Sequence, residues 1–378
     1  MANSRKNMSS RASSEGPGRA GTQARASRPA HPPALLAAAR GERVAGAIDA
    51  ATVSAAARER MAGLLAHAAD EPPRELLLHA VAIEARAASM VAELTRIAET
   101  FRVANVPLLA LKGAVASQQL YGNPGLRVFG DLDLLVASHH IGQAESLLAR
   151  LGYRDESPMT PSQRATKHRF HNGTPLVNDE RKTTVDLHWR LGHVQFPLAL
   201  PVADAWSRRT ELVLNGVTVP ALGPTDLAIF TCSHAAKHLW WTLESLAQIA
   251  ALTRLPNVDW DEVDRVATAS RGGKQVGLSF LLAHHVIGSE LPPLPKCLAL
   301  SRPHFARMQE RLSGTLERDA GGRDLLFLLD RKRDALAATL AAAFVPTHAD
   351  WEAAKLPGFL YWVARPLRLV AKRLNPAR

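Results

Sequence analysis

The sequence has few cysteines and no long uncharged apolar segment. Of its 378 residues only Cys232 and Cys297 are cysteines, and neither has the spacing of a metal or redox motif. This excludes a disulfide framework and a cysteine-rich zinc module, and it is typical of a reducing cytoplasm. The longest uncharged apolar runs, such as 275–289, are too short to span a bilayer. The start lacks the apolar centre of a secretory signal. We therefore expect a cytoplasmic protein without a transmembrane segment.

Positive charge is concentrated at the two ends of the chain. The 46 lysines and arginines outnumber the 35 acidic residues, which gives a net charge of +11. Residues 1–31 contain six basic residues and Glu15 as the only acid, and residues 365–378 contain five basic residues and no acid. The part between them is nearly neutral, so its charge does not indicate a nucleic-acid groove. Nucleic acid stays open as a partner through the tails, but it is not the favoured one.

Hydrophobic periodicity divides the chain into four segments. Residues 1–33, rich in Ser, Gly, Ala and Pro, are predicted to be a disordered basic leader. In residues 34–101 apolar side chains recur every three or four positions, which indicates an N-terminal helical segment. Strand-like runs and glycine turns follow in residues 102–220, and helical spacing returns in residues 221–378. These patterns predict the α+β class, with a small mixed sheet held between two helical segments.

Turn residues separate the elements expected in the central segment. Asn215-Gly216 is the strongest turn signal and predicts a hairpin within residues 211–219. The turn Asn178-Asp179-Glu180 predicts an antiparallel pair on either side of it. The remaining predictions are strands at 106–111, 131–136, 170–177 and 182–189, and helices at 113–121 and 139–151.

Acidic side chains at alternate positions of two predicted strands form the most informative pattern. Asp131 and Asp133 share one strand face, while the leucines between them face the core. Two neighbouring carboxylates repel each other unless a cation such as Mg²⁺ lies between them. Two exposed acids on a strand are an equally good interpretation. If the strand with Asp186 and His188 lies beside the first, three carboxylates converge, and such a set can hold two Mg²⁺ ions ~4 Å apart.

A glycine corner precedes the acidic strand. Lys112-Gly113 ends one predicted strand and opens a helix, so backbone N–H groups and a helix N-terminus can face a phosphate. Lys112 would add a cation there. Arg127, just before the acidic strand, either binds a phosphate oxygen or pairs with Asp131 to hold the loop. By itself such a corner is a common turn, and it gains weight from the acidic strand that follows.

Four further side chains are candidates for the acceptor side. His188 shares a strand face with Asp186 and either orients it or is a hydrogen-bonded sheet histidine. His234 and His238 are one helical turn apart, a spacing that can bind zinc. No third ligand is evident, so a structural role or contact with the acceptor is favoured. Lys237 on the same helix either reaches a phosphate or is solvated.

The C-terminal segment 359–374 is amphipathic and basic. Such a segment can lie on an anionic membrane surface, or it can pack its apolar side on the protein body with its arginines in water. Because Pro366 interrupts a long helix, we expect the apolar side to pack on the body.

These motifs occur together in one known superfamily. A strand–Gly–helix corner, an Asp-x-Asp strand and a third acidic strand resemble the DNA polymerase β-like core of the nucleotidyltransferases. More narrowly, the sequence is similar to a poorly characterised bacterial branch called nucleotidyltransferase family proteins. The resemblance covers roughly residues 80–374 and rests on Leu111-Lys112-Gly113, Gly125-Leu126-Arg127, Asp131-Leu132-Asp133-Leu134-Leu135-Val136, Leu151-Gly152-Tyr153, Val185-Asp186-Leu187-His188-Trp189, His234-Ala235-Ala236-Lys237-His238-Leu239-Trp240 and Arg365-Pro366-Leu367-Arg368.

The resemblance implies an activity and roles for the candidate residues. Asp131 and Asp133 would bind two Mg²⁺ ions, with Mn²⁺ as an alternative, and Asp186 would bind one ion and activate the acceptor hydroxyl. The Lys112-Gly113 corner would cradle the triphosphate, and residues 102–220 would be the nucleotidyltransferase core. The expected reaction is transfer of an NMP group from an NTP such as ATP to an acceptor hydroxyl or phosphate, with release of pyrophosphate. The acceptor is an unidentified small molecule, peptide or protein.

Two positions depart from the pattern of the family. Gly113-Ala114 stands where many members have Gly-Ser, so a hydroxyl that touches phosphate is missing. Gln248 stands where the related pattern leads us to expect an acid. The first departure keeps a non-catalytic nucleotide-binding scaffold open as a second function class, although all three carboxylates are present. The basic tails keep an RNA-modifying nucleotidyltransferase open as a third.

Overall fold

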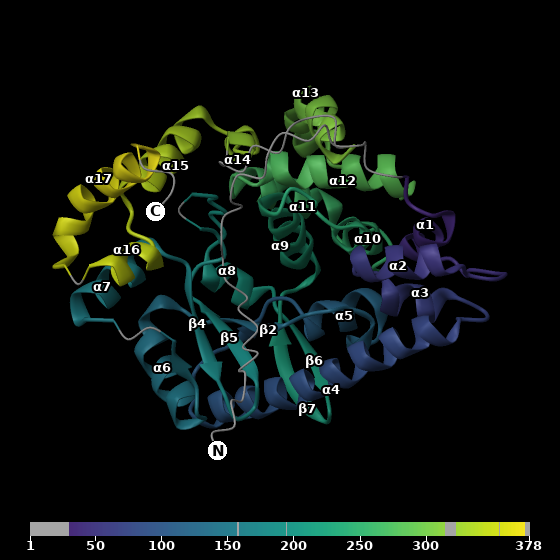
Figure 1. The fold of residues 1–378 in the computed structure, drawn as a ribbon, viewed down its shortest axis with the longest axis horizontal. Coiled ribbons are helices and arrows are strands. Elements are labelled where there is room, and N and C mark those ends of the chain that lie inside the picture. Colours follow the sequence, from purple (N-terminus) through teal and green to yellow (C-terminus); the bar gives the residue numbers. More distant parts are fainter. Residues whose placement is uncertain (1–29, 157–158, 194, 314–322, 355, 375–378) are drawn as a thin grey trace, which may run out of the picture.

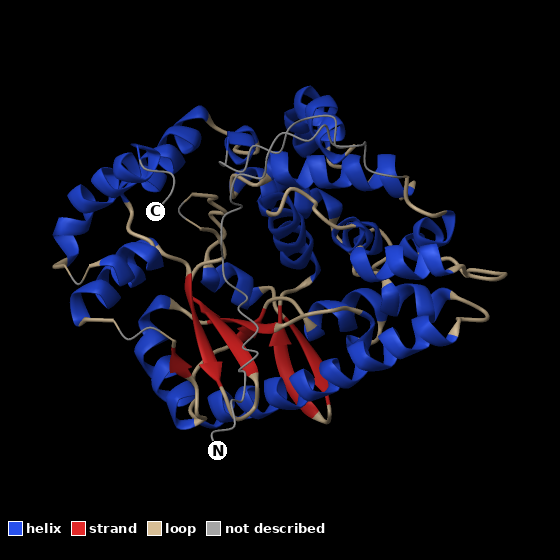
Figure 2. Ribbon diagram, viewed as in Figure 1, coloured by secondary structure: helices blue, strands red, loops and turns tan. Residues whose placement is uncertain are grey.

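A computed structural model describes residues 30–156, 159–193, 195–313, 323–354 and 356–374. The predicted basic leader therefore lies almost entirely outside the described residues. A single mixed sheet occupies one side of the molecule, and most of the helices gather over one of its faces and along its edges (Figures 1 and 2). This confirms the predicted α+β class.

The sheet places the two acidic strands side by side. Its seven strands run in the order β3-β4-β5-β2-β1-β7-β6. The pair β2–β5 is parallel, with Asp133 opposite Asp186 and Asp131 opposite Thr184. The condition under which the three carboxylates converge, the adjacency of the two acidic strands, is therefore met. The strand bounds are Leu109–Ala110 (β1), Asp131–Leu135 (β2), Arg154–Asp155 (β3), Gly173–Asn178 (β4), Thr183–His188 (β5), Thr210–Leu214 (β6) and Val217–Ala221 (β7).

Several predicted elements are confirmed, and others are shorter or new. The antiparallel pair β4–β5 and the hairpin β6–β7 around Asn215-Gly216 are present as predicted. The strand predicted at 106–111 is only two residues long, because Pro107 has no N–H to donate to a ladder. The sequence patterns did not predict β3 or the two helices Pro161–Phe170 (α7) and Val202–Ser207 (α8).

Apolar residues cover both faces of the sheet and explain its orientation. Leu132, Leu134 and Val185 belong to a buried cluster between the sheet and the long helix α4. Met90 and Phe101 of α4 belong to the same cluster. Leu135, on the opposite strand face, belongs to a second cluster built mainly from the helices. The polar side chains of β2 and β5 thus face the helical side of the sheet. The helices next to the core are Arg74–Val103 (α4), Ala114–Tyr121 (α5) and Ile141–Arg150 (α6), with 3₁₀ turns at Pro124–Leu126 and Ser138–His140.

The N-terminal and C-terminal helices pack against each other. α1 lies against α10 and α12, so segments far apart in the sequence form one helical body (Figure 1). In the described part of the chain, no helix combines the length and apolarity that a membrane crossing requires. The remaining bounds are Pro33–Arg40 (α1), Ala50–Arg58 (α2), Ala62–Ala68 (α3), Pro224–Lys237 (α9), Leu243–Leu252 (α10), Trp260–Ala269 (α11), Gly273–Ile287 (α12), Pro295–Leu312 (α13), Arg323–Phe327 (α14), Lys332–Phe344 (α15), His348–Ala353 (α16) and Tyr361–Leu374 (α17), with a 3₁₀ turn at Gly358–Leu360.

Candidate active site

Two carboxylates and one imidazole converge on the helical face of the sheet. The imidazole Nε2 of His188 lies 3.2 Å from Asp133 Oδ1 and 3.2 Å from Asp186 Oδ2. One ligand atom from each of these residues lies within 4.8 Å of the others, which is close enough to share a metal ion. Asp131 precedes Asp133 by two residues on the same strand face, outside this group of three.

Lys112 contributes a positive charge to the same site. Its Nζ lies 3.0 Å from Asp133 Oδ2, and the Asp133 side chain is only 2% exposed. Within the described chain this oxygen has no well-aligned hydrogen-bond donor, so the contact with Lys112 is an ion pair. A buried carboxylate oxygen without a hydrogen bond is costly. The ammonium of Lys112 offsets part of that cost, and a further cation at this position would offset more of it.

The pKa values of the site follow from burial and from its crowded charges. Burial and the neighbouring Asp133 carboxylate raise the pKa of Asp131. Burial alone would also raise the pKa of Asp186, but the charge and hydrogen bond of His188, together with the charges of Lys112 and Lys237, outweigh burial and lower this pKa. Burial would lower the pKa of His188, but Asp186 and Asp133 raise it to about 9. Lys112 likewise has a raised pKa, since the carboxylates outweigh its burial.

The charge balance of the site suits a divalent cation. Asp131, Asp133 and Asp186 bring three carboxylates together, whereas Lys112 and protonated His188 bring two positive charges. Oxygen donors of this kind are the ligands of Mg²⁺ and Mn²⁺, whereas a protonated His188 has no free nitrogen lone pair and would balance charge beside the metal. The residues present therefore fit the predicted metal.

The glycine corner is built in a conformation that favours glycine. Gly113 has φ +66° and ψ −124° and directly precedes the first residue of α5. A Cβ on this residue would lie 3.3 Å from the ring of Phe129. Because Lys112 is paired with Asp133, the corner lies beside the carboxylates. Backbone N–H groups at the start of a helix are suited to binding phosphate.

Arg127 forms a buried ion pair that the sequence did not predict. Its Nε donates to Oε1 of Glu244 on α10 at 2.5 Å, with the two side chains 8% and 6% exposed. The predicted alternative, a pair with Asp131, is therefore wrong. The Nε2 of Gln248 donates to the same Glu244 oxygen at 2.8 Å, so the acid of this helix lies one turn before the position where the family pattern led us to expect it. Arg127 Nη1 is buried and has no hydrogen-bond partner in the described chain.

The end of α9 carries the predicted acceptor-side residues. The rings of His234 and His238 have their centres 4.8 Å apart, and they belong to no metal-binding group among the described residues. Burial and the charge of Lys112 lower the pKa of His234. Burial and the charge of Lys237 lower the pKa of His238 to about 4. Burial and Lys112 also lower the pKa of Lys237. The influence of Lys112 on all three places this end of α9 near the carboxylates.

His193 belongs to the same surroundings but was not among the predicted residues. Burial and the charge of Lys237 lower its pKa to about 4, and its ring packs edge-on against His171 with the centres 5.9 Å apart. It lies in an irregular segment between β5 and α8. No periodic pattern marks that segment, so no sequence signal pointed to it.

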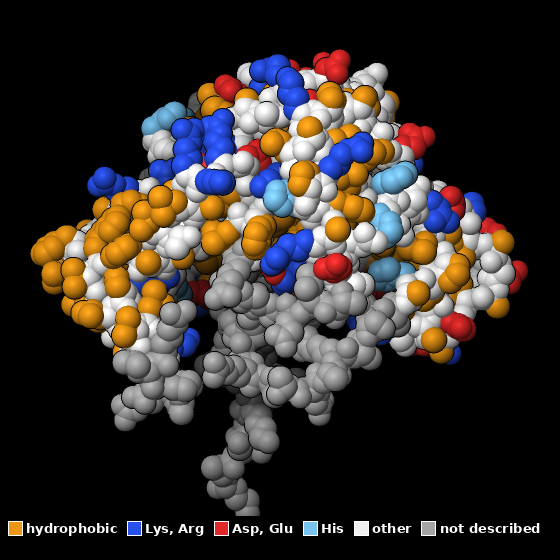
Figure 3. Space-filling view, turned by 90° about the horizontal axis from the view of Figure 1, so that it is seen from above, with side chains coloured by type: hydrophobic (Ala, Val, Ile, Leu, Met, Phe, Trp, Pro, Cys, Tyr) orange, Lys and Arg blue, Asp and Glu red, His pale blue; other side chains and the backbone are white. Residues whose placement is uncertain are grey.

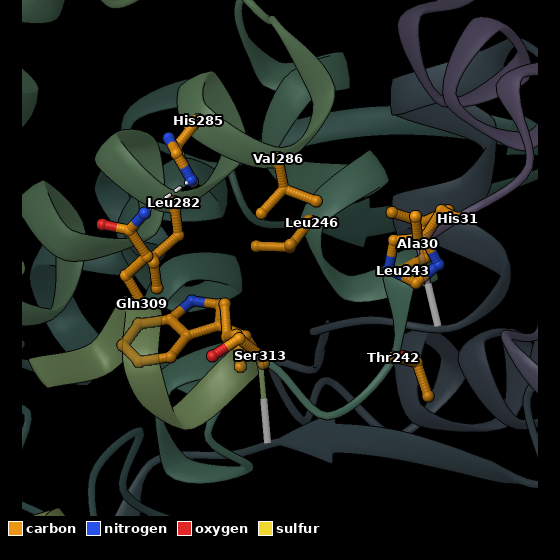
Figure 4. Close-up of a pocket in the computed structure, with 12 residues that line it drawn as sticks. Ala30, His31, Thr242, Leu243, Leu246, Leu282, His285, Val286, Gln309 and Ser313 are labelled. Atoms are coloured by element: carbon orange, nitrogen blue, oxygen red, sulfur yellow. Dashed lines mark hydrogen bonds between the residues drawn. The ribbon is translucent and has the colours of Figure 1, made fainter. Parts of the chain in front are cut away.

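A separate apolar cavity of about 210 Å³ lies away from these residues (Figure 4). Leu243 and Leu246 of α10, together with Leu282 and Val286 of α12, line much of it. Gln309 Nε2 donates to His285 Nε2 at its side, at 2.9 Å. None of the converging carboxylates, histidines or lysines contributes to its wall, so the chemistry is not located there.

Comparison with known families agrees with this geometry. Residues 29–288 match the model of a family described as uncharacterised nucleotidyltransferase. The chain belongs to this family. The nucleotidyltransferase resemblance inferred from its motifs is thereby confirmed within residues 29–288, and the sheet with its helices is the fold of a nucleotidyltransferase. No curated protein matches the chain.

Three solved structures align with about half of the chain. A crystal structure of ANT(2″)-Ia in complex with adenylyl-2″-tobramycin aligns with 17% identity and a TM-score of 0.34, covering 48% of this chain and 97% of that one. A solution structure of the antibiotic-resistance factor ANT(2″)-Ia gives 16% identity and a TM-score of 0.35, covering 53% and 97%. An antigenic nucleotidyltransferase-like protein from Paracoccidioides brasiliensis gives 13% identity and a TM-score of 0.31, covering 54% and 94%.

Proposed function

We propose that this nucleotidyltransferase moves an NMP group from an NTP to an acceptor hydroxyl or phosphate and releases pyrophosphate, in the cytoplasm. The observation that carries the proposal is the convergence of Asp133, Asp186 and His188 next to Lys112. An arrangement of carboxylates and a lysine beside a glycine corner suits a metal-bound triphosphate. The acceptor's chemical class is left open.

The carboxylates are the proposed metal ligands. Asp131, Asp133 and Asp186 would hold Mg²⁺ or Mn²⁺, and bound metal would neutralise charge on the triphosphate and acidify the acceptor hydroxyl. His188 is the proposed positioning residue, because its Nε2 lies 3.2 Å from an oxygen of both Asp133 and Asp186. Asp186 is the proposed acceptor of the hydroxyl proton. Its side chain is 33% exposed, compared with 2% for Asp133, so it is the carboxylate that an incoming acceptor can reach.

Three groups are proposed to bind the triphosphate. Lys112 is 25% exposed, so its ammonium can contact a phosphate while it stays paired with Asp133. The N–H groups that follow Gly113 are the second group. The third is the Nη1 of Arg127, which has no partner in the described chain, and binding a phosphate oxygen would satisfy it. Lys237, His234 and His238 are proposed to face the acceptor, with both imidazoles neutral at pH 7.

Calorimetry of NTP binding tests this proposal. We expect each NTP that binds to require Mg²⁺ or Mn²⁺, and we expect the double variant Asp131→Asn/Asp133→Asn to lose that binding. Asp179→Asn is the matched control, because Asp179 is an exposed acid that pairs with Arg154 on the surface. Metal-independent binding, or equal binding by both variants, would contradict the assignment. Binding without turnover in an acceptor screen would instead support the scaffold function that Ala114 in place of serine leaves open.

A further inference from the structure

The two C-terminal helices α15 and α17 present apolar side chains to solvent. On α17, Val363, Leu367 and Val370 are 63%, 65% and 56% exposed, and their spacing of four and three residues aligns them on one face. On α15, Leu336 and Leu340 are 62% and 50% exposed, one turn apart. Hydrophobic side chains gather at the end of the molecule where these helices lie (Figures 1 and 3). The aromatic members of the same surface are Phe344, Phe359 and Trp362.

Polar contacts on the inner face of α17 fix this orientation. Arg365 Nη1 lies 2.5 Å from Asp350 Oδ2, and Arg368 Nε lies 2.6 Å from Asp350 Oδ1. The hydroxyl of Tyr361 accepts from Gln163 Nε2 at 2.6 Å, and Tyr361 is 1% exposed. The expectation that the apolar side would pack on the body is therefore wrong. The buried Asp350 draws the arginines inward, so the apolar side faces outward.

The charges around this surface are mainly positive. Arg331, Lys332 and Arg333 are exposed at the start of α15, and Lys372 is exposed near the end of α17. Within the described part of 331–372, Glu352 is the only exposed acid. The acids Asp334 and Asp350 are buried. An apolar surface with aromatic residues and a cationic border complements an anionic bilayer, whose interface accepts apolar side chains while its headgroups attract lysine and arginine.

We propose that α15 and α17 form a docking surface for a bilayer rich in anionic phospholipid. Val363, Leu367, Val370, Leu336 and Leu340 enter the interfacial region, and the basic residues at the helix ends contact the headgroups. The surface is a pair of adjoining helices, and an exposed apolar patch of this kind marks an interaction site. The docking surface lies beyond residue 288, where the family match ends, so membrane docking would be a property additional to those of the matched family region.

Vesicle sedimentation with the full chain tests this proposal. Vesicles of equimolar phosphatidylcholine and phosphatidylglycerol are compared with vesicles of phosphatidylcholine alone. We expect binding to the anionic vesicles to exceed binding to the neutral ones by at least about tenfold and to weaken as salt increases. The variant Val363→Asp/Leu367→Asp is expected to lower the partition coefficient at least about tenfold, because two apolar side chains become charged.

A matched control separates this surface from general surface hydrophobicity. Leu78 and Val81 on α4 are 62% and 61% exposed, so Leu78→Asp/Val81→Asp makes the same chemical change elsewhere, and we expect it to bind vesicles like the wild type. The proposal would be overturned if both double variants lost vesicle binding equally. It would also be overturned if the wild type did not bind anionic vesicles. A dimer in light scattering that Val363→Asp/Leu367→Asp dissociates, without vesicle binding, would assign the surface to a second copy of the chain. Nucleotide binding, measured in parallel, is expected to be unchanged in both variants.

Discussion

Removing Glu244 tests the role of the buried ion pair that joins the sheet region to α10. The side chains of Arg127 and Glu244 are 8% and 6% exposed and meet at 2.5 Å. Glu244→Ala leaves the guanidinium buried without its counter-charge, and breaking a buried pair in this way costs about 3–5 kcal/mol. Because a domain is stable by only about 5–15 kcal/mol, the effect on unfolding should be large.

The double variant Arg127→Met/Glu244→Leu separates charge from packing. Replacing both partners by apolar side chains of similar size removes the uncompensated charge, so we expect it to be within about 1 kcal/mol of the wild type. Urea denaturation of the wild type, Arg127→Met, Glu244→Leu and the double variant gives the coupling free energy. If Glu244→Ala costs less than about 1 kcal/mol, or if the double variant is as unstable as the sum of the single variants, the reasoning about this pair is wrong.

The same double variant decides between the structural and the phosphate-binding role of Arg127. If Nη1 binds a phosphate oxygen, the loss of a charge-assisted hydrogen bond worth about 1.5–3 kcal/mol should weaken NTP binding at least tenfold while the fold stays intact. Calorimetry with an NTP and Mg²⁺ measures this. An unchanged dissociation constant would assign Arg127 to holding α10 in place.

Three further predictions concern a turn, a C-terminal anchor and a histidine. Gly113→Ala should lose about 1–3 kcal/mol of stability in urea denaturation, because φ +66° strains alanine, and it should weaken NTP binding in calorimetry. Gly122→Ala is the control, since Gly122 has φ +71° with open space around it. It should show the loss of stability with unchanged NTP binding. Asp350→Ala should free α17 at a cost of about 3–5 kcal/mol by leaving Arg365 buried without its partner, seen as faster amide exchange in 361–374. Burial lowers the pKa of His193 from 6.5 to about 4, so the unfolded chain binds a proton at a higher pH than the folded chain does. The free energy of unfolding should therefore fall as the pH drops from about 6.5 to about 4. His193→Gln should make the fall between pH 7 and pH 5 smaller by about 1–3 kcal/mol, as measured by urea titrations at both pH values.

Alternating side chains made the site predictable from the sequence. Asp131, Asp133 and Asp186 lie on strands whose leucines and valines face a buried cluster, and this two-residue period places the acids on the opposite face. The glycine corner was predictable because the turn from strand to helix favours a residue without a Cβ. The capping box of Thr160 and Gln163 marks the start of α7, a mostly polar helix that apolar periodicity does not reveal.

Contacts between distant residues could not be predicted. Glu244 lies 117 positions after Arg127, and nothing local to either residue indicates the pair. The orientation of α17 depends on Asp350, which lies on α16 and turns the arginines of an amphipathic helix inward. A local pattern reveals that such a helix has two faces, whereas the packing of the whole chain decides which face is buried.

The central claim is that the carboxylates of Asp131, Asp133 and Asp186 bind a metal ion that holds the triphosphate. Electron paramagnetic resonance of Mn²⁺, titrated into the chain with a non-hydrolysable ATP analogue, tests it most directly. We predict saturable Mn²⁺ binding that Mg²⁺ displaces, that requires the nucleotide for full affinity, and that Asp133→Asn/Asp186→Asn abolishes. A folded wild type whose Mn²⁺ spectrum stays that of the free ion, or a double variant that binds Mn²⁺ like the wild type, would contradict the account.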